Sequence, residues 1–88
     1  MNKQYRIYIA NIPKDVIIEE VKLVGYDAFT IIPCTGVWKK EVESCHIVEI
    51  ISDTVETGNL KRLARILKSV SNEGCFLLTE SKIEGMLI

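Results

Sequence analysis

The segment 35–44 contains residue types that can bind a small anion. It holds the only tryptophan of the chain, Trp38, followed directly by Lys39 and Lys40 and preceded by Gly36. An indole ring can stack on a base, ammonium groups can pair with phosphate, and a glycine lets backbone amides approach a ligand. The combination suits a nucleotide-like anion. In the alternative interpretation, Trp38 packs on a neighbouring strand and the lysines are solvated at a turn.

The expected ligand-binding set extends beyond the tryptophan and its lysines. Arg62 and Arg65, on a predicted helix, and Tyr8 join it only through the two family resemblances described below. The full set comprises Thr35, Gly36, Trp38, Lys39, Lys40, Glu43, Ser44, His46, Arg62, Arg65 and Tyr8.

Catalytic and metal chemistry find little support in the residue pattern. His46 is the only histidine, which excludes any mechanism that needs two. Ser44 and His46 share a strand face, but a Ser–His dyad would also need an orienting acid and an oxyanion loop, and neither is evident. Cys45 and His46 are adjacent on a strand and therefore point to opposite faces, so they cannot bind the same metal. We expect no catalytic residues, no metal and no cofactor, and thus no enzymatic activity.

Composition limits the class of protein. The 88 residues suffice for one domain, residues 1–88, and the 48% hydrophobic content predicts that it folds. Eleven basic residues against twelve acidic ones leave no global field for nucleic acid or an anionic membrane. No apolar run approaches the roughly 20 residues that span a bilayer, which together with the polar start predicts a cytoplasmic protein without a membrane partner. Three cysteines without close spacing are predicted to be reduced thiols, with Cys45 and Cys75 in strands.

Apolar periodicity predicts four strands and two helices. Strands are expected over residues 5–10, 26–32, 41–51 and 75–80, with residues 33–40 as the tip of a hairpin. A first helix is expected from a cap at Asp15 to Val24, ended by Gly25. A second helix carries Leu60 and the apolar residues that follow it at helical spacing, and ends at Gly74.

This order of elements predicts an α+β fold, the ferredoxin-like βαββαβ sandwich, with two helices on one face of a four-stranded antiparallel sheet. The other sheet face would then be open, yet alternate strand positions are apolar on both sides, as in residues 7–10 and 76–78. Another molecule is expected to cover such a face, and we favour a second copy of the chain as that molecule. The tail 81–88 is expected to add a strand or an oligomer contact.

Residues 7–13 resemble the first signature of RNA-recognition-motif domains, an apolar-aromatic-apolar-x-Asn-apolar strand. That resemblance implies a base stacked on Tyr8. The second signature of the family needs glycines and two aromatic residues on the third strand, but residues 43–49 have neither and are acidic. RNA binding is therefore an alternative and not the main hypothesis.

The element order, the two-sided sheet and the position of the segment 35–44 resemble the PII-like family of trimeric ferredoxin-like signalling proteins. Their ligands bind in clefts between subunits beside a projecting loop. The resemblance implies a non-catalytic homo-oligomer, with a trimer favoured, that senses or sequesters a nucleotide or cyclic-nucleotide signal and in which Arg62 or Arg65 reaches a neighbour's site. A free-standing binder of this kind also fits a phage protein that removes a host defence signal. A protein-interaction module that docks through its open sheet face is the other alternative.

Overall fold

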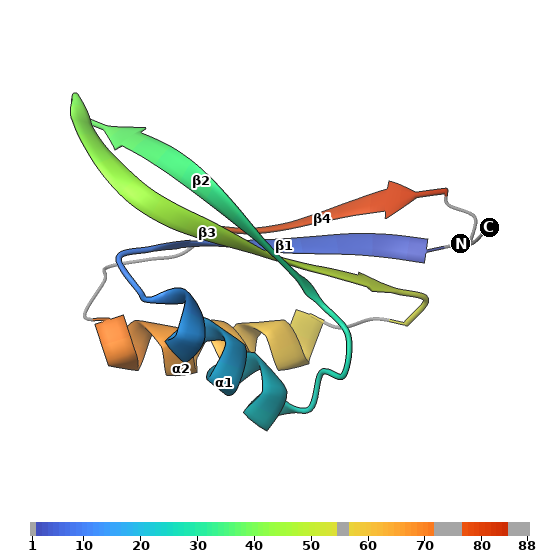
Figure 1. Ribbon diagram of the computed structural model, residues 1–88. Helices are drawn as coiled ribbons and strands as arrows, with labels where there is room; N and C mark the ends of the chain where they lie inside the picture. The colour runs from blue at the N-terminus through green and yellow to red at the C-terminus, as the bar shows by residue number, and fades with distance from the viewer. Residues whose placement is uncertain (1, 55–56, 72–76, 85–88) are drawn as a thin grey trace.

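The computed structural model describes residues 2–54, 57–71 and 77–84, which form six elements (Figure 1). Their order is strand, helix, strand, strand, helix, strand. The elements are β1 (Asn2–Ala10), α1 (Lys14–Val24), β2 (Thr30–Trp38), β3 (Glu41–Ser52), α2 (Thr57–Ser71) and β4 (Leu77–Ile83). None of the helices in these ranges is long and apolar enough to cross a membrane.

The four strands form one antiparallel sheet in the order β2-β3-β1-β4. Both helices lie on the same side of this sheet, and the opposite face carries no helix of the described chain (Figure 1). The two sequentially adjacent strands β2 and β3 are joined by a hairpin, whereas β1 is inserted between β3 and β4. This topology confirms the predicted ferredoxin-like fold.

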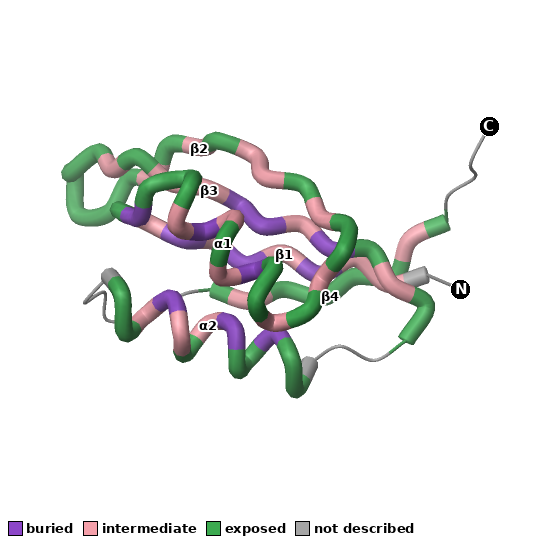
Figure 2. Tube along the Cα trace, turned by 60° about the horizontal axis from the view of Figure 1, so that its bottom comes forward, coloured by how far each residue is buried: buried purple, intermediate pink, exposed green. Residues whose placement is uncertain are grey.

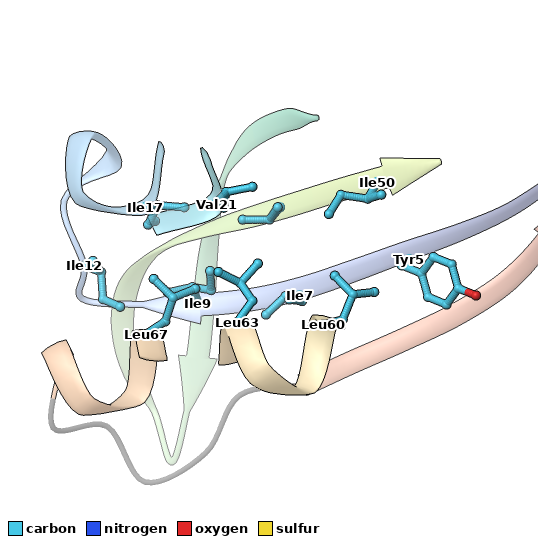
Figure 3. Packing of buried hydrophobic residues seen from close by; sticks show 11 residues of the cluster. Tyr5, Ile7, Ile9, Ile12, Ile17, Val21, Ile50, Leu60, Leu63 and Leu67 are labelled. Carbon is cyan, nitrogen blue, oxygen red and sulfur yellow. The ribbon is translucent and has the colours of Figure 1, made fainter. Parts of the chain in front are cut away.

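The core lies between the sheet and the helices. Alternation along β1 turns Tyr5, Ile7 and Ile9 toward the helices, where all three are buried. The inward stripe of α2 meets them with the buried residues Leu60, Leu63 and Leu67 (Figure 3). The Tyr5 hydroxyl keeps a polar partner by donating a hydrogen bond to the carbonyl of Thr54 at 3.4 Å. Burying an aliphatic side chain of this size contributes about 1.5–3 kcal/mol, so this layer holds the helices on the sheet.

The C-terminal end of α1 lies where the sequence predicts it, whereas the residue that caps its N-terminal end is a different one. Pro13 occupies the N-cap position without a side-chain hydrogen bond, and Asp15 lies inside the first turn. The expectation that Asp15 caps the helix is therefore wrong; its carboxylate instead complements the positive end of the helix dipole. Gly25 ends the helix as predicted, in the left-handed conformation with φ 113°.

The second strand lies later in the sequence than predicted. It was expected over residues 26–32 with a loop at 33–40, but β2 covers Thr30–Trp38 and only Lys39 and Lys40 form the turn. Pro33 lies inside the strand, which is tolerated because β2 is at the edge of the sheet. Backbone pairing with β3 as far as Trp38 and Glu41 outweighs the local turn signals of this segment.

The last strand extends farther toward the C-terminus than predicted. Residues 81–83 extend β4, with Ser81 opposite Gln4 and Ile83 opposite Asn2, so this part of the tail continues the fourth strand and adds no new one. The predicted start of the strand at Cys75 and Phe76, the predicted helix end at Gly74 and the last four residues lie outside the described residues.

Candidate functional site

The hairpin formed by β2 and β3 carries most of the predicted ligand-binding residues. Its strands are in register from Thr30 opposite Glu49 to Trp38 opposite Glu41. On its other side, β3 pairs with β1, and this pairing ends with Ala10 opposite Cys45. The hairpin beyond that point therefore projects past the sheet (Figure 1). Residues 37–42 at its tip are all exposed (Figure 2).

The turn brings an aromatic ring and two cations together at the tip. Trp38 is 69% exposed, so it does not pack into the core, while the lysines are exposed at a turn as the alternative interpretation expects. The Nζ atom of Lys39 lies 5.9 Å from the centroid of the indole ring, within the range of a cation–π interaction. Lys40 completes the two-residue turn and is also exposed. The tip therefore presents a ring face and two ammonium groups to solvent.

Strand alternation divides the rest of the predicted set between two faces of the hairpin. Gly36, Trp38 and Glu43 belong to the open face of the sheet. Thr35, Ser44 and His46 belong to the face on the helix side, and they do not share one surface with Trp38. The Nδ1 atom of His46 is buried and has no hydrogen-bond partner among the described residues.

Tyr8 and an apolar row occupy the middle of the open sheet face. Ile32, Ile47, Tyr8 and Leu77 lie side by side across the four strands. Leu77 is 59% exposed. Ile51, the next open-face residue of β3 after Glu49, is 55% exposed. These side chains confirm that the open face is apolar at its centre, as the alternation of the strands predicted.

An ion pair lies next to this row. The Arg6 Nη2 atom is 2.8 Å from Oε2 of Glu49, and Arg6 Nε donates a hydrogen bond to the same oxygen at 3.0 Å. A hydrogen bond with Tyr8 and the contact with Glu49 raise the pKa of Arg6 above its usual range. The guanidinium is therefore already engaged within the chain, so among the described residues the middle of the open face has little free positive charge for RNA.

The two predicted helix arginines lie away from the hairpin. Arg62 and Arg65 are exposed on α2, in the helical layer, whereas the hairpin tip rises from the sheet layer (Figure 1). One subunit does not bring them together with Trp38. A site that combines these arginines with the hairpin would need the α2 of another subunit.

A small pocket lies at the edge of the sheet and was not predicted. It has a volume of about 150 Å³ and is lined by Ala28, Phe29, Thr30, Glu49 and Ile51. Its one charged lining residue is the Glu49 carboxylate, which is a poor partner for an anion. We therefore do not assign the anionic ligand to this pocket.

The prediction that the cysteines are reduced thiols is wrong for two of them. A disulfide joins Cys34 to Cys45, with 4.9 Å between their Cα atoms. The two residues lie directly opposite each other in β2 and β3, and Cys34 belongs to a strand and not to a loop. Recognising Lys39–Lys40 as a two-residue turn would have revealed the pair, because the cysteines are equally distant from it. Cys45 lies in a strand as predicted, and Cys75 is outside the described residues.

Known proteins share this fold but not this sequence. No family model matches the chain, and no curated protein does. A DUF3240 family protein from Shewanella baltica is 17% identical, with a TM-score of 0.70, over 98% of this chain and 97% of that one. CPII, a nitrogen regulatory PII-like protein from Thiomonas intermedia bound to ADP, AMP and bicarbonate, is 13% identical, with a TM-score of 0.64, over 99% and 96%. GlnK of B. subtilis, in complex with ATP, is 16% identical, with a TM-score of 0.60, over 92% and 82%. The chain thus resembles the PII-like proteins at the level of the fold.

Proposed function

We propose that the chain is a non-catalytic subunit of a homo-oligomer, with a trimer favoured, that binds a small anionic, nucleotide-like ligand beside the β2–β3 hairpin. The observation that carries the proposal is the exposed tip, where Lys39 lies over the ring of Trp38 and Lys40 follows. A ring and two ammonium groups can provide the stacking surface and the counter-charge that a nucleotide requires. The bound nucleotides named for CPII and for GlnK support the same class of ligand for this fold.

The open sheet face supports association of subunits. Tyr8, Ile32, Ile47 and Leu77 form an apolar row there, and a face of this kind on a small domain usually marks an interaction surface. The PII-like proteins that the fold resembles assemble as trimers, which favours a second and third copy as the cover. In such an assembly the α2 of one subunit can approach the hairpin of the next, and Arg62 and Arg65 would then add cations to the ligand site.

Binding without turnover would let the protein sense or sequester a cytoplasmic nucleotide signal. The Ser–His pair in the predicted set, Ser44 and His46, lacks an evident orienting acid or oxyanion loop in the sequence. An unchanged nucleotide recovered after incubation is therefore the expected outcome.

The native mass in solution and the identity of any bound small molecule test the proposal together. We expect an oligomer whose heat-released extract contains a nucleotide, identified by mass spectrometry. An empty monomer would contradict the proposal and favour RNA or a different protein as the partner.

Substitutions at the tip test the location of the site. We expect Trp38→Ala and Lys39→Ala to weaken the binding of the recovered nucleotide at least tenfold, measured by calorimetry, while the melting temperature stays within about 2 °C because both side chains are exposed. Lys14→Ala, at an exposed position at the start of α1, is the matched control and should leave the affinity unchanged. Equal affinity of the Trp38→Ala variant and the original protein would refute the assignment.

A further inference from the structure

We propose that Cys34 and Cys45 form a reversible redox staple at the root of the β2–β3 hairpin, which keeps the hairpin ordered when oxidised and lets it open when reduced. The two cysteines form the last cross-strand pair before the hairpin leaves the sheet, since Cys45 is also the last residue of β3 that pairs with β1. The disulfide thus lies at the boundary between the four-stranded sheet and the projecting two-stranded part.

The pair is placed where a thiol in solution can reach it. Both cysteines are only half-buried, and they lie away from the helical layer. On the open face they come one pair beyond Ile32 and Ile47, at the end from which the hairpin projects and outside the apolar row proposed to be covered by other subunits. Across the sheet, the small side chain of Ala10 lies next to Cys45. A disulfide that is exposed to this degree is open to thiol–disulfide exchange.

The projecting part has few other sources of stability. Among the described residues, the backbone of residues 35–44 pairs only within the hairpin, apart from a hydrogen bond that the Asn11 amide donates to the carbonyl of Ser44 at 3.3 Å. Val37 and Val42 are opposite each other but largely exposed, so they add little burial. A two-stranded hairpin alone is marginal in water.

The turn itself opposes the hairpin. Lys39 and Lys40 have φ values of 50° and 67°, a left-handed conformation that is unfavourable for residues with a β-carbon. A crosslink at the root offsets this cost because it limits the freedom of the opened segment. Closing a loop of this length with a disulfide changes the equilibrium constant for opening by about a hundredfold at most.

The chemistry of the switch is ordinary thiol–disulfide exchange with a thiol of the glutathione class. The thiolate attacks one Sγ atom, a mixed disulfide forms, the Cys34–Cys45 bond breaks, and the other cysteine leaves as a thiolate. A second thiolate attacks the mixed disulfide and releases the second cysteine together with one molecule of oxidised reagent. The protein gains two electrons and two protons, and the reverse reaction with the oxidised reagent restores the bond. In a reducing compartment such pairs are usually redox-sensing.

The consequence for ligand binding rests on the proposed function, because Trp38 and the two lysines occupy the tip that the staple holds in place. An ordered hairpin presents the ring and the cations in one geometry, whereas an open one must be ordered at a cost when a ligand binds.

The test uses a Cys75→Ser variant, so that only this pair can exchange, in the presence of either glutathione or its disulfide. Intact mass should show the oxidised form to be lighter by two hydrogen atoms. Because Trp38 is the only tryptophan, its fluorescence anisotropy reports on the hairpin, and we expect it to fall on reduction. Hydrogen exchange of the amides of residues 36–43 should become at least tenfold faster, while the amides of Ile7 and Val48 in the core keep their rates.

Two results would overturn the proposal. One is failure of the pair to oxidise at any ratio of glutathione to its disulfide; the other is unchanged anisotropy and exchange in the fully reduced protein. A Cys34→Ser/Cys45→Ser variant should match the reduced form in both redox conditions. These readouts need no ligand, so a protein that binds no nucleotide can still confirm the staple, and a nucleotide-binding protein with a redox-insensitive hairpin would refute the staple alone.

Discussion

Replacing Lys40 by glycine should stabilise the protein, although the substitution removes a side chain and a charge. Lys39 and Lys40 form the two-residue turn between β2 and β3, and both have positive φ, at 50° and 67°. Two-residue hairpin turns of this kind favour Asn-Gly, because glycine adopts the left-handed conformation without a steric cost. The present sequence therefore contains a strained residue at the position where glycine is most favourable.

The expected gain follows from two opposing terms. The left-handed conformation costs a residue with a β-carbon about 1–2 kcal/mol, and glycine removes that cost. Glycine also makes the unfolded chain more flexible, which costs about 0.5–1 kcal/mol. The net stabilisation for Lys40→Gly is about 0.5–1 kcal/mol, and for a chain of this length it raises the melting temperature by about 2–8 °C.

Thermal and urea unfolding of the oxidised protein, followed by circular dichroism, measure this difference. Lys61→Gly is the matched control, because it removes the same exposed side chain from the interior of α2, where the backbone is helical. That variant should lose about 1 kcal/mol. If Lys40→Gly lowers the melting temperature as Lys61→Gly does, the strain assigned to the turn is absent and the reasoning fails.

Three further predictions concern the core, a helix end and a surface ion pair. Leu63→Ala removes a fully buried side chain and should cost about 2–5 kcal/mol in urea unfolding, whereas Leu23→Ala, 75% exposed, should cost less than about 0.5 kcal/mol; similar losses would contradict the packing. Gly25→Ala places a β-carbon at φ 113° and should cost about 1 kcal/mol, while Gly36→Ala, with open space and no positive φ, should leave the melting temperature nearly unchanged. A hydrogen bond and an ion pair with the Glu80 carboxylate raise the pKa of Lys3 above 10.5. The contribution of this ion pair to stability is therefore complete below that pH and is lost as the pH rises further. Unfolding curves from about pH 9 to about pH 12 should show a smaller fall for Lys3→Met than for the original protein.

The fold was predictable because each helix and strand carries its own signal. The recurrence of Leu60, Leu63 and Leu67 fixes the inward stripe of α2, and Gly25 marks the end of α1. The β-branched and aromatic residues between Tyr5 and Ala10 identify the first strand. These signals lie within a few residues of each other, so a local pattern is sufficient.

The register of the hairpin was not predictable in the same way. Pro33 and Gly36 are turn residues by local preference, yet they lie inside β2, since pairing with β3 continues to Trp38 and Glu41. The favourable ladder outweighs the local preferences of a few residues, and it is visible only when both strands are considered together.

The candidate site depends on that register. The sequence identified the residue types at the hairpin, but only the register shows that Trp38 shares a face with Glu43 while Thr35 and His46 lie on the other. The arrangement of the helices on one side of the sheet, in turn, places the helix arginines away from the hairpin tip of the same chain (Figure 1).

By itself, the sequence determined the order of the elements, the ferredoxin-like class and the apolar character of both sheet faces. These properties follow from local periodicity, which each segment carries independently of the others. The tertiary structure alone decided the exposure of Trp38, the strained turn and the disulfide between Cys34 and Cys45. Each of these depends on which residues of two different strands come to lie opposite each other, and that pairing is settled by cross-strand hydrogen bonds and packing against the rest of the sheet.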